Sequence, residues 1–326
     1  MKPIRPSSGP GRHQRGAALL TAMIIVTLVT TLAAAMVWQQ WRAVQVEAAE
    51  RARSQAAWIL TGALDFARLI LKETVREGKP TAMTDPWATP LAEARLSTFL
   101  AADKNNADDG PEAFLSGYIV DAQSRYNLND LVTEQGKVLP DELGVLERLC
   151  EAVGIETSVA GVIAKGMAEA TAGTAATAPL KPQRVDQLVW FGVDAASIQA
   201  LRPYVVLLPY VPPLPRSTAV NLNTAPAEVL VAAFKGLDRA TAERLVQLRQ
   251  RQPFKELTGF TSQFSSDIKP ATPVDIKSIY FEVHSRLRLE DRVLVERSML
   301  VRDRTGTNPY SVYQRERVAS LEQVGP

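Results

Sequence analysis

The chain has 326 residues, of which 37 are Lys or Arg and 35 are Asp or Glu, and its formal net charge is +2. Residues 1–16 hold four basic residues and no acidic one, so removing them would leave a net charge of −2. A slightly acidic protein is a poor candidate for non-specific binding to nucleic acid. The single cysteine, Cys150, excludes a disulfide within the chain, and its helical spacing with Leu146 predicts a buried thiol.

Catalytic residue patterns are missing from the sequence. Histidine occurs at two positions, His13 and His284. No Ser-His-Asp arrangement, metal-ligating histidine pair or phosphate-binding glycine loop accompanies them. His284 lies in an alternating segment and is predicted to be a surface residue on a strand. We therefore expect a binding or structural protein rather than an enzyme.

A basic cluster precedes a long apolar segment near the start of the chain. The cluster consists of Lys2, Arg5, Arg12 and Arg15. No residue from Ala17 to Trp41 is formally charged, and a helix of about 20 such residues spans the ~30 Å bilayer core. This pattern predicts a membrane helix with a cytoplasmic N-terminus. A signal peptide cut after Ala35 is the alternative, but the apolar run is too long for a signal core.

The same region resembles the N-terminus of type IV pilins and type II secretion pseudopilins. The shared features are a short basic leader, Gly16, an unbroken apolar stretch and an amphipathic continuation to about Arg76. The resemblance implies that a prepilin peptidase cuts after Gly16, which makes Ala17 the mature N-terminus. It also implies a glutamate at the fifth mature position, where this chain has Thr21.

Thr21 is the candidate assembly residue. A carboxylate inside a bilayer costs at least ~2.5 kcal/mol, so it persists only where it has a partner. In pilins the implied partner is the terminal amine of a neighbouring subunit. A subunit without this carboxylate lacks one means of adding beneath another subunit, which suits a position at the fibre tip. The simpler alternative is that Thr21 is an ordinary uncharged residue of a membrane helix.

Two tripeptides echo each other in the soluble part. Asn127-Leu128-Asn129 and Asn221-Leu222-Asn223 both precede helical patterns, so we predict two helical units that begin alike. The surrounding segments, DAQSRYNLNDL and VNLNTAPAEVL, resemble those of the K subunits of type II secretion systems. The resemblance implies a minor pseudopilin with a large helical insertion.

The second segment also resembles a helix-hairpin-helix module, which binds DNA phosphate through backbone N–H groups. Asp238 stands where the second loop glycine would fall, and it is predicted to cap the helix that starts at Arg239. A structural helical hairpin is therefore the favoured interpretation, and the alternative function is a membrane-tethered DNA-binding protein of a DNA-uptake or type IV pilus system.

A calcium site is the possible cofactor site. Asp103, Asn105, Asp108 and Asp109 offer oxygen donors at close spacing, but Ala107 breaks the spacing of an EF-hand. A solvated polar turn is the favoured alternative. No cofactor is certain, and calcium is possible.

Three aromatic residues are predicted to be buried. Trp87 is predicted to be a packing anchor, and the two adjacent residues Trp190 and Phe191 are predicted to be core residues.

Period-two alternation in residues 279–289, followed by shorter strand-like segments, predicts an antiparallel sheet with one polar face. We expect an α+β, pilin-like fold: a long N-terminal helix packed on this C-terminal sheet, with a large all-α insertion. The expected parts are a leader at 1–16, a transmembrane helix at 17–41, a pseudopilin helix and first strand at 42–127, an all-α insertion with a helix-hairpin-helix-like unit at 128–264, and C-terminal strands at 265–326.

The resemblance implies a minor pseudopilin at the tip of a type II secretion pseudopilus, which helps to start its assembly. Implied partners are the other minor pseudopilins of the I, J and H types, the major pseudopilin, the prepilin peptidase and the inner-membrane secretion platform. Nucleic acid is not an expected partner. The implied location is the bacterial inner membrane, with one membrane pass and most of the chain in the periplasm.

Overall fold

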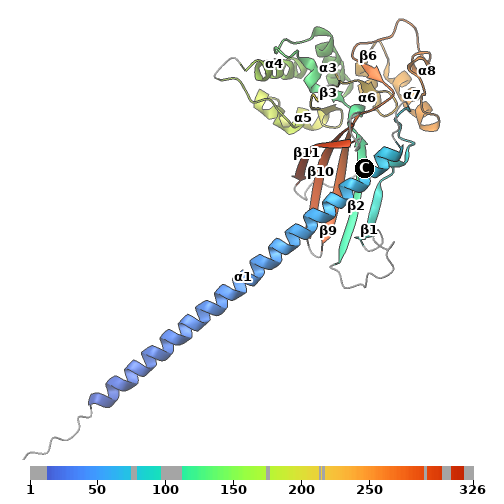
Figure 1. The fold of residues 1–326 in the computed structure, drawn as a ribbon. Coiled ribbons are helices and arrows are strands. Elements are labelled where there is room, and N and C mark those ends of the chain that lie inside the picture. Colours follow the sequence, from blue (N-terminus) through green and yellow to red (C-terminus); the bar gives the residue numbers. More distant parts are fainter. Residues whose placement is uncertain are drawn as a thin grey trace, which may run out of the picture. The chain divides into compact units, whose positions relative to one another are not determined.

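The computed structural model describes residues 13–74, 79–96, 112–173, 177–212, 214, 217–289, 292–302 and 310–318 (Figure 1). The chain divides into two compact units, residues 1–58 and 59–326. Helix α1, His13–Thr74, continues without a break from the first unit into the second. The candidate calcium ligands Asp103 to Asp109 lie outside the described residues.

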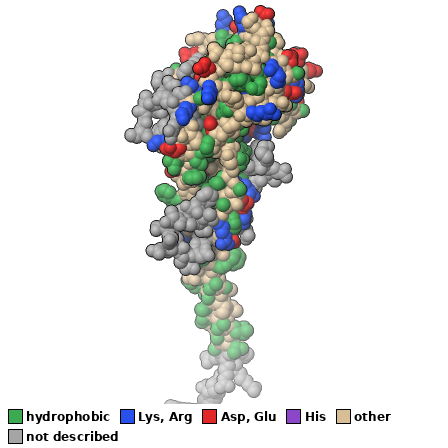
Figure 2. Space-filling view, turned by 90° about the vertical axis from the view of Figure 1, so that its right-hand side faces the viewer, with side chains coloured by type: hydrophobic (Ala, Val, Ile, Leu, Met, Phe, Trp, Pro, Cys, Tyr) green, Lys and Arg blue, Asp and Glu red, His purple; other side chains and the backbone are tan. Residues whose placement is uncertain are grey.

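The first unit contains the membrane-length part of α1. Every large apolar side chain from Leu19 to Val46 is more than half exposed, and these side chains dominate the surface of this helix (Figure 2). Within the described residues, α1 is the one helix long and apolar enough to cross a membrane. Trp38 and Trp41 stack with ring centroids 5.4 Å apart, where the uncharged run ends.

The second unit contains a five-stranded antiparallel sheet in the order β1-β2-β9-β10-β11. Its strands are β1 (Leu91–Arg95), β2 (Ala113–Asp121), β9 (Tyr280–Leu289), β10 (Arg292–Arg302) and β11 (Tyr310–Val318). The predicted strands are thus present, whereas β1 was not predicted because its short segment does not alternate clearly. The pairing of β2 with β9 brings the beginning and the end of the soluble chain into one sheet.

One face of this sheet packs against the end of α1. The core between them consists of Leu64, Ala67, Leu71, Trp87, Phe281, Val283, Leu300 and Tyr310. The helical residues recur at spacings of three and four, which places them on one side of α1. Each fully buried Leu contributes about 1.5–3 kcal/mol. Trp87, in the short 3₁₀ helix η1 (Pro86–Ala88), is buried as predicted and meets Phe281 edge to face.

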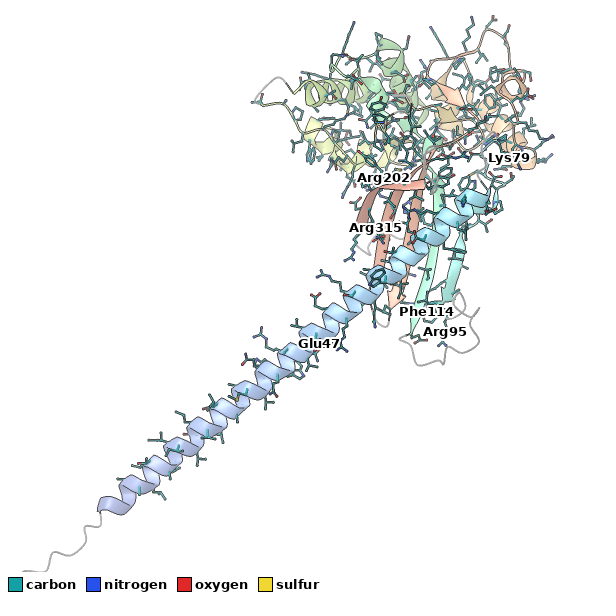
Figure 3. All side chains as sticks on the ribbon, in the orientation of Figure 1. Glu47, Lys79, Arg95, Phe114, Arg202 and Arg315 are labelled. Carbon is teal, nitrogen blue, oxygen red and sulfur yellow. The ribbon has the colours of Figure 1, made fainter. Side chains whose placement is uncertain are left out.

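The other face of the sheet is polar at one end and covered at the other. At the exposed end, Arg95 and Arg288 lie over the ring of Phe114 at 5.8 and 3.9 Å (Figure 3). At the covered end, Tyr280 is buried against the inserted region. The predicted polar face is therefore only partly solvated, because the insertion covers its upper half.

The insertion holds two helical subdomains. The first runs through η2 (Ala122–Ser124), β3 (Tyr126–Asn127), η3 (Leu128–Leu131), α3 (Pro140–Ala152), α4 (Ser158–Ala172), η4 (Val185–Phe191), α5 (Ala195–Leu201) and β4 (Val205–Val206). The second runs through β5 (Val220–Asn221), α6 (Ala227–Ala233), β6 (Phe234–Lys235), α7 (Arg239–Arg251), α8 (Leu257–Thr261), β7 (Lys269–Pro270) and β8 (Val274–Asp275).

Each subdomain begins and ends with short parallel strands that pair with each other, β3 with β4 and β5 with β8. The segment therefore differs from the expected all-α insertion, because these strand pairs and the antiparallel pair β6-β7 close its loops. Residues 269–275, expected with the C-terminal sheet, pair within the second subdomain instead. The two subdomains share one hydrophobic core, in which Cys150 is buried as predicted. Burial raises the pKa of its thiol to about 11.

Candidate functional site

The predicted processing and assembly residues lie near the start of α1. Gly16 and Ala17 are both helical, and Ala17 is exposed. The hydroxyl of Thr21 donates a hydrogen bond to the carbonyl oxygen of Ala17 at 2.8 Å. Thr27, Thr30 and Thr31 also satisfy their hydroxyls on their own helix. Thr21 therefore adds no charge and no unsatisfied polar group to the apolar helix surface.

Further along α1, an apolar surface faces away from the sheet. Phe66 is 44% exposed and Leu69 is 54% exposed, one helical turn apart. Gly62 lies one turn before Phe66, and a Cβ added there would meet no atom within 4 Å. An exposed apolar side chain such as that of Leu69 is suited to packing against another helix.

A buried polar cluster, which we call the Asp121 junction, connects strand β2 to the second subdomain. One carboxylate oxygen of Asp121 accepts hydrogen bonds from Asn221, Thr224 and Ser278 at 2.9, 2.6 and 2.6 Å. The other accepts from the backbone N–H of Gln123 at 2.9 Å. Burial raises the pKa of the Asp121 carboxyl, because these neutral donors offset only part of the desolvation.

The two predicted tripeptides occupy equivalent positions but differ in their bonding. Both side-chain oxygens accept from the backbone N–H two residues further on, Asn127 from Asn129 and Asn221 from Asn223. The side-chain amides differ: that of Asn127 donates to Asp130 and Thr218, whereas that of Asn221 donates to Asp121, to Ser278 and to the carbonyl of Thr81, at the edge of the pilin-like sheet. Sequence reasoning found the repeat but missed Asp121 and Ser278, which are distant from it in sequence.

A second connection, the Glu282 junction, is made of ion pairs. Arg125 lies 2.9 Å from the buried carboxylate of Glu282 on β9, and the His284 imidazole lies 3.5 Å from it. His284 also stacks on Tyr118 and its side chain is 19% exposed, so it lies on a strand as predicted but is more buried than the predicted surface residue. Burial alone would raise the pKa of the Glu282 carboxyl, but Arg125, His284 and Arg297 outweigh it and hold this pKa well below its usual range.

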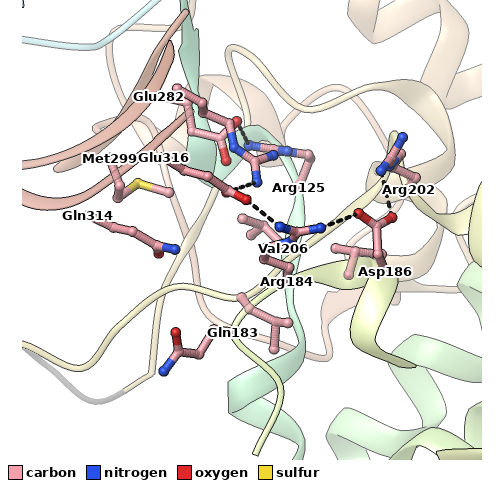
Figure 4. Close-up of a pocket in the computed structure, with 13 residues that line it drawn as sticks. Arg125, Gln183, Arg184, Asp186, Arg202, Val206, Glu282, Met299, Gln314 and Glu316 are labelled. Atoms are coloured by element: carbon pink, nitrogen blue, oxygen red, sulfur yellow. Dashed lines mark hydrogen bonds and ion pairs between the residues drawn. The ribbon is translucent and has the colours of Figure 1, made fainter. Parts of the chain in front are cut away.

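Beside this junction is a cavity of about 70 Å³ between the first subdomain and the sheet (Figure 4). Its charged lining residues are Arg125, Arg184, Asp186, Arg202, Glu282, Arg297 and Glu316. Glu316 pairs with both Arg184 and Arg297, while Asp186 pairs with both Arg184 and Arg202. The pair of Arg184 with Glu316 joins the first subdomain to β11, and the other pairs hold these two side chains in place.

The helix-hairpin-helix-like unit is formed by α6 and α7. The side chain of Asp238 accepts a hydrogen bond from the N–H of Thr241 at 2.9 Å, so it caps α7 as predicted. This carboxylate occupies the place where a phosphate would have to bind. Arg239 pairs with Glu228 and Glu243, and Arg249 is buried with its guanidinium on two backbone carbonyls. These contacts favour a structural role for the unit.

Two adjacent aromatic residues, Trp190 and Phe191, were both predicted to lie in the core. Trp190 is 46% exposed, so the prediction that it belongs to the core is wrong, whereas Phe191 packs against Gly166, where an added Cβ would lie 2.2 Å from its ring. The sequence does not show which of two adjacent aromatic residues in the short 3₁₀ helix η4 is exposed. In the described part of the chain, no group of three or more His, Cys, Asp or Glu is placed to hold a metal ion.

Architecture and N-terminus together define the class: an α+β pilin-like protein with a bilayer-length helix. Family models described as type II secretion system protein K match residues 124–210 and 220–276, which are the two helical subdomains. These matches, together with the relatives below, support the role of a minor pseudopilin, a structural component of the secretion system.

Relatives of known role extend the similarity over most of the chain. Type II secretion system protein K of Pseudomonas aeruginosa is 28% identical, covering 90% of this chain and 91% of that protein. Its counterpart in Pectobacterium carotovorum is 26% identical, covering 88% and 92%. The crystal structure of the GspK-GspI-GspJ complex from enterotoxigenic Escherichia coli contains a chain with the same fold, with a TM-score of 0.57 and 18% identity over 83% of this chain and 99% of that one.

Proposed function

We propose that this minor pseudopilin occupies the tip of the pseudopilus and helps to start its assembly for protein export across the outer membrane. The observation that carries the proposal is the insertion of two helical subdomains, which covers one half of a sheet face and is fixed there by two buried junctions. A rigid protrusion of this size is difficult to repeat inside a tightly wound fibre. It is readily accommodated at an end.

The start of α1 supports the same position. Thr21 bonds to its own helix and carries no charge, so it gives a neighbouring subunit's amine no carboxylate to bind. The basic leader and the stacked Trp38 and Trp41 lie at opposite ends of the apolar run, as expected for a helix with a cytoplasmic N-terminus and an aromatic anchor at the outer interface. A helix with this orientation would have the second unit on the periplasmic side.

Other minor pseudopilins are the proposed partners. A protein of the same fold has been crystallised as a complex of GspK, GspI and GspJ. In this chain, the exposed Leu69 on α1 offers an apolar contact for a partner helix. The major pseudopilin, the prepilin peptidase that cuts after Gly16 and the inner-membrane platform complete the set of proposed partners.

Processing is the first test. Gly16→Phe should prevent cleavage before Ala17, and we expect the uncut chain to fail to restore secretion in a strain that lacks it. Gly62→Ala is the matched control on α1, because an added Cβ there meets nothing. Intact mass measures cleavage, and the exported protein in the medium measures function. Normal secretion by uncut Gly16→Phe protein would refute the proposal.

Position in the fibre needs a second test. A photo-crosslinking amino acid at the exposed Leu69 should capture other minor pseudopilins in assembling cells, while the same group at the exposed Gln247 of α7 should not. Capture of the major pseudopilin alone, at many positions along the fibre, would contradict a tip location.

A further inference from the structure

The surface of the second subdomain includes two lysines that face each other. Strands β6 and β7 form an antiparallel pair in which Lys235 lies directly opposite Lys269, and both residues are exposed. Side chains at opposite positions of such a pair point to the same side, with their Cβ atoms about 4.5–5.5 Å apart. Like charges placed in this way repel each other, so the two lysines lower the stability of the strand pair that carries them.

A third cation is connected to this strand pair by packing and hydrogen bonding. The ring of Phe234 in β6 packs on that of Phe264, with centroids 5.5 Å apart. The residue before Phe264 is Gln263, whose carbonyl oxygen accepts a hydrogen bond at 2.9 Å from the guanidinium of Arg244 on α7. This carbonyl is neutral, so it leaves the charge of the exposed Arg244 uncompensated. We define the cationic surface as Lys235, Arg244 and Lys269.

Carboxylates of the protein do not neutralise the cationic surface. Among the described residues, no Asp or Glu forms an ion pair with any of its three cations, whereas the neighbouring Arg239 pairs with two glutamates. Asp238 and Asp267 are the acidic residues closest to it in sequence. The carboxylate of Asp238 accepts hydrogen bonds from the N–H and the hydroxyl of Thr241, and that of Asp267 accepts one from the hydroxyl of Ser265.

The residues around the cationic surface select the class of partner. A nucleic-acid phosphate would need the N–H groups at the start of α7, but Asp238 already occupies the N–H of Thr241 and would repel the phosphate. A protein segment can instead place single carboxylates on the lysines and its uncharged backbone beside Asp238. Gly236, which is exposed next to Lys235, has no side chain to prevent the close approach of such a segment.

We propose that the cationic surface is a docking site for an acidic segment of a partner protein, which places a carboxylate between Lys235 and Lys269. A bound carboxylate would offset the repulsion between the two lysines, so binding would remove a destabilising interaction of the unbound protein. The cationic surface is separate from α1 and from both junctions, and the proposal does not depend on the position of the protein in the fibre.

The probe is a fluorescently labelled hexaglutamate peptide, titrated by anisotropy into the complete chain in a non-ionic detergent. We expect binding that weakens as sodium chloride is added, because salt screens exposed ion pairs. Lys235→Gln combined with Lys269→Gln should weaken binding about five-fold at low salt. The matched control, Arg251→Gln combined with Lys255→Gln, removes the same charge from exposed positions of the same subdomain and should leave binding nearly unchanged. Equal weakening by both double variants would overturn the proposal.

Thermal unfolding shows whether the double lysine variant folds. Because Lys235→Gln with Lys269→Gln removes a repulsion, its unfolding midpoint in the absence of peptide should be no lower than that of wild type. A lower midpoint would mean that the two lysines stabilise their own strand pair, and it would overturn the proposal.

Carbodiimide coupling locates the bound peptide. The reagent activates a carboxylate of hexaglutamate, which then forms an amide with a nearby lysine amine and releases the reagent as a urea. Mass spectrometry of protein fragments should find more coupling at Lys235 and Lys269 than at the exposed Lys255. Equal coupling at all three lysines would overturn the proposal. A short DNA duplex that binds more tightly than the peptide, and is released by the double lysine variant, would overturn it in favour of nucleic acid.

Discussion

The two junctions that hold the insertion on the sheet compensate the charge of a buried carboxylate in different ways. Asp121 and Glu282 are buried carboxylates on the paired strands β2 and β9. Asp121 is surrounded by neutral donors, and burial keeps its pKa raised. Glu282 faces Arg125 and His284, and its pKa is lowered despite burial. Hydrogen bonds alone therefore leave part of the charge uncompensated, whereas a buried cation compensates it and makes the junction depend on that cation.

The largest effect should come from removing the cation of the Glu282 junction. Arg125→Gln leaves the buried Glu282 without its main counter-charge, and we expect a loss of about 3–5 kcal/mol in the free energy of unfolding. Urea unfolding of the complete chain in detergent measures this loss. Arg292→Gln, an exposed change on β10, should cost less than about 0.5 kcal/mol. A loss below 1 kcal/mol for Arg125→Gln would show that the ion pair does not hold the junction.

Breaking the neutral junction should cost somewhat less. Asn221→Ala removes one of the three side-chain donors to Asp121 and leaves the N–H of Asn223 without its acceptor. We expect a loss of about 2–3 kcal/mol in the same urea experiment. The matched control is Asn129→Ala in the first tripeptide.

The Asn129 side chain makes one hydrogen bond to the Leu208 carbonyl, and its own oxygen has no partner in the described residues. Asn129→Ala should therefore cost about 1 kcal/mol. Equal losses in Asn221→Ala and Asn129→Ala would mean that the connection to Asp121 adds nothing to the local loop.

The sequence predicted local features of these junctions but not their connections. Alternation located β9 and β10, and the repeated Asn-Leu-Asn located the starts of both subdomains, because both signals lie in short contiguous segments. The alternation in residues 279–289 predicted a polar face, yet the burial of Glu282 on that face depends on a subdomain that begins more than 150 residues earlier. No local pattern encodes such a contact.

Because no local pattern encodes long-range contacts, some predictions from the sequence were wrong or incomplete. Trp190 and Phe191 are adjacent aromatic residues, and only the packing of Phe191 on Gly166 decides which one is buried. The cavity escaped prediction because its arginines come from separate segments, each of which reads as ordinary surface charge. In contrast, the bilayer-length helix was predictable, because bilayer thickness and charge exclusion act on one continuous segment.

The smallest expected effect is the change in stability with pH, and it distinguishes the Glu282 junction from the Asp121 junction most clearly. Folding lowers the pKa of Glu282, so its stabilisation is present above its unfolded value near 4.5 and is lost as the pH falls below that value. Folding raises the pKa of Asp121, so the folded state binds the extra proton and stability falls as the pH rises above the unfolded value of about 3.8. Urea unfolding between pH 3 and 7 separates the two: the advantage of wild type over Glu282→Gln should shrink toward pH 3, whereas its advantage over Asp121→Asn should grow. Parallel profiles for both variants would show that neutral donors and cations compensate a buried carboxylate equally here.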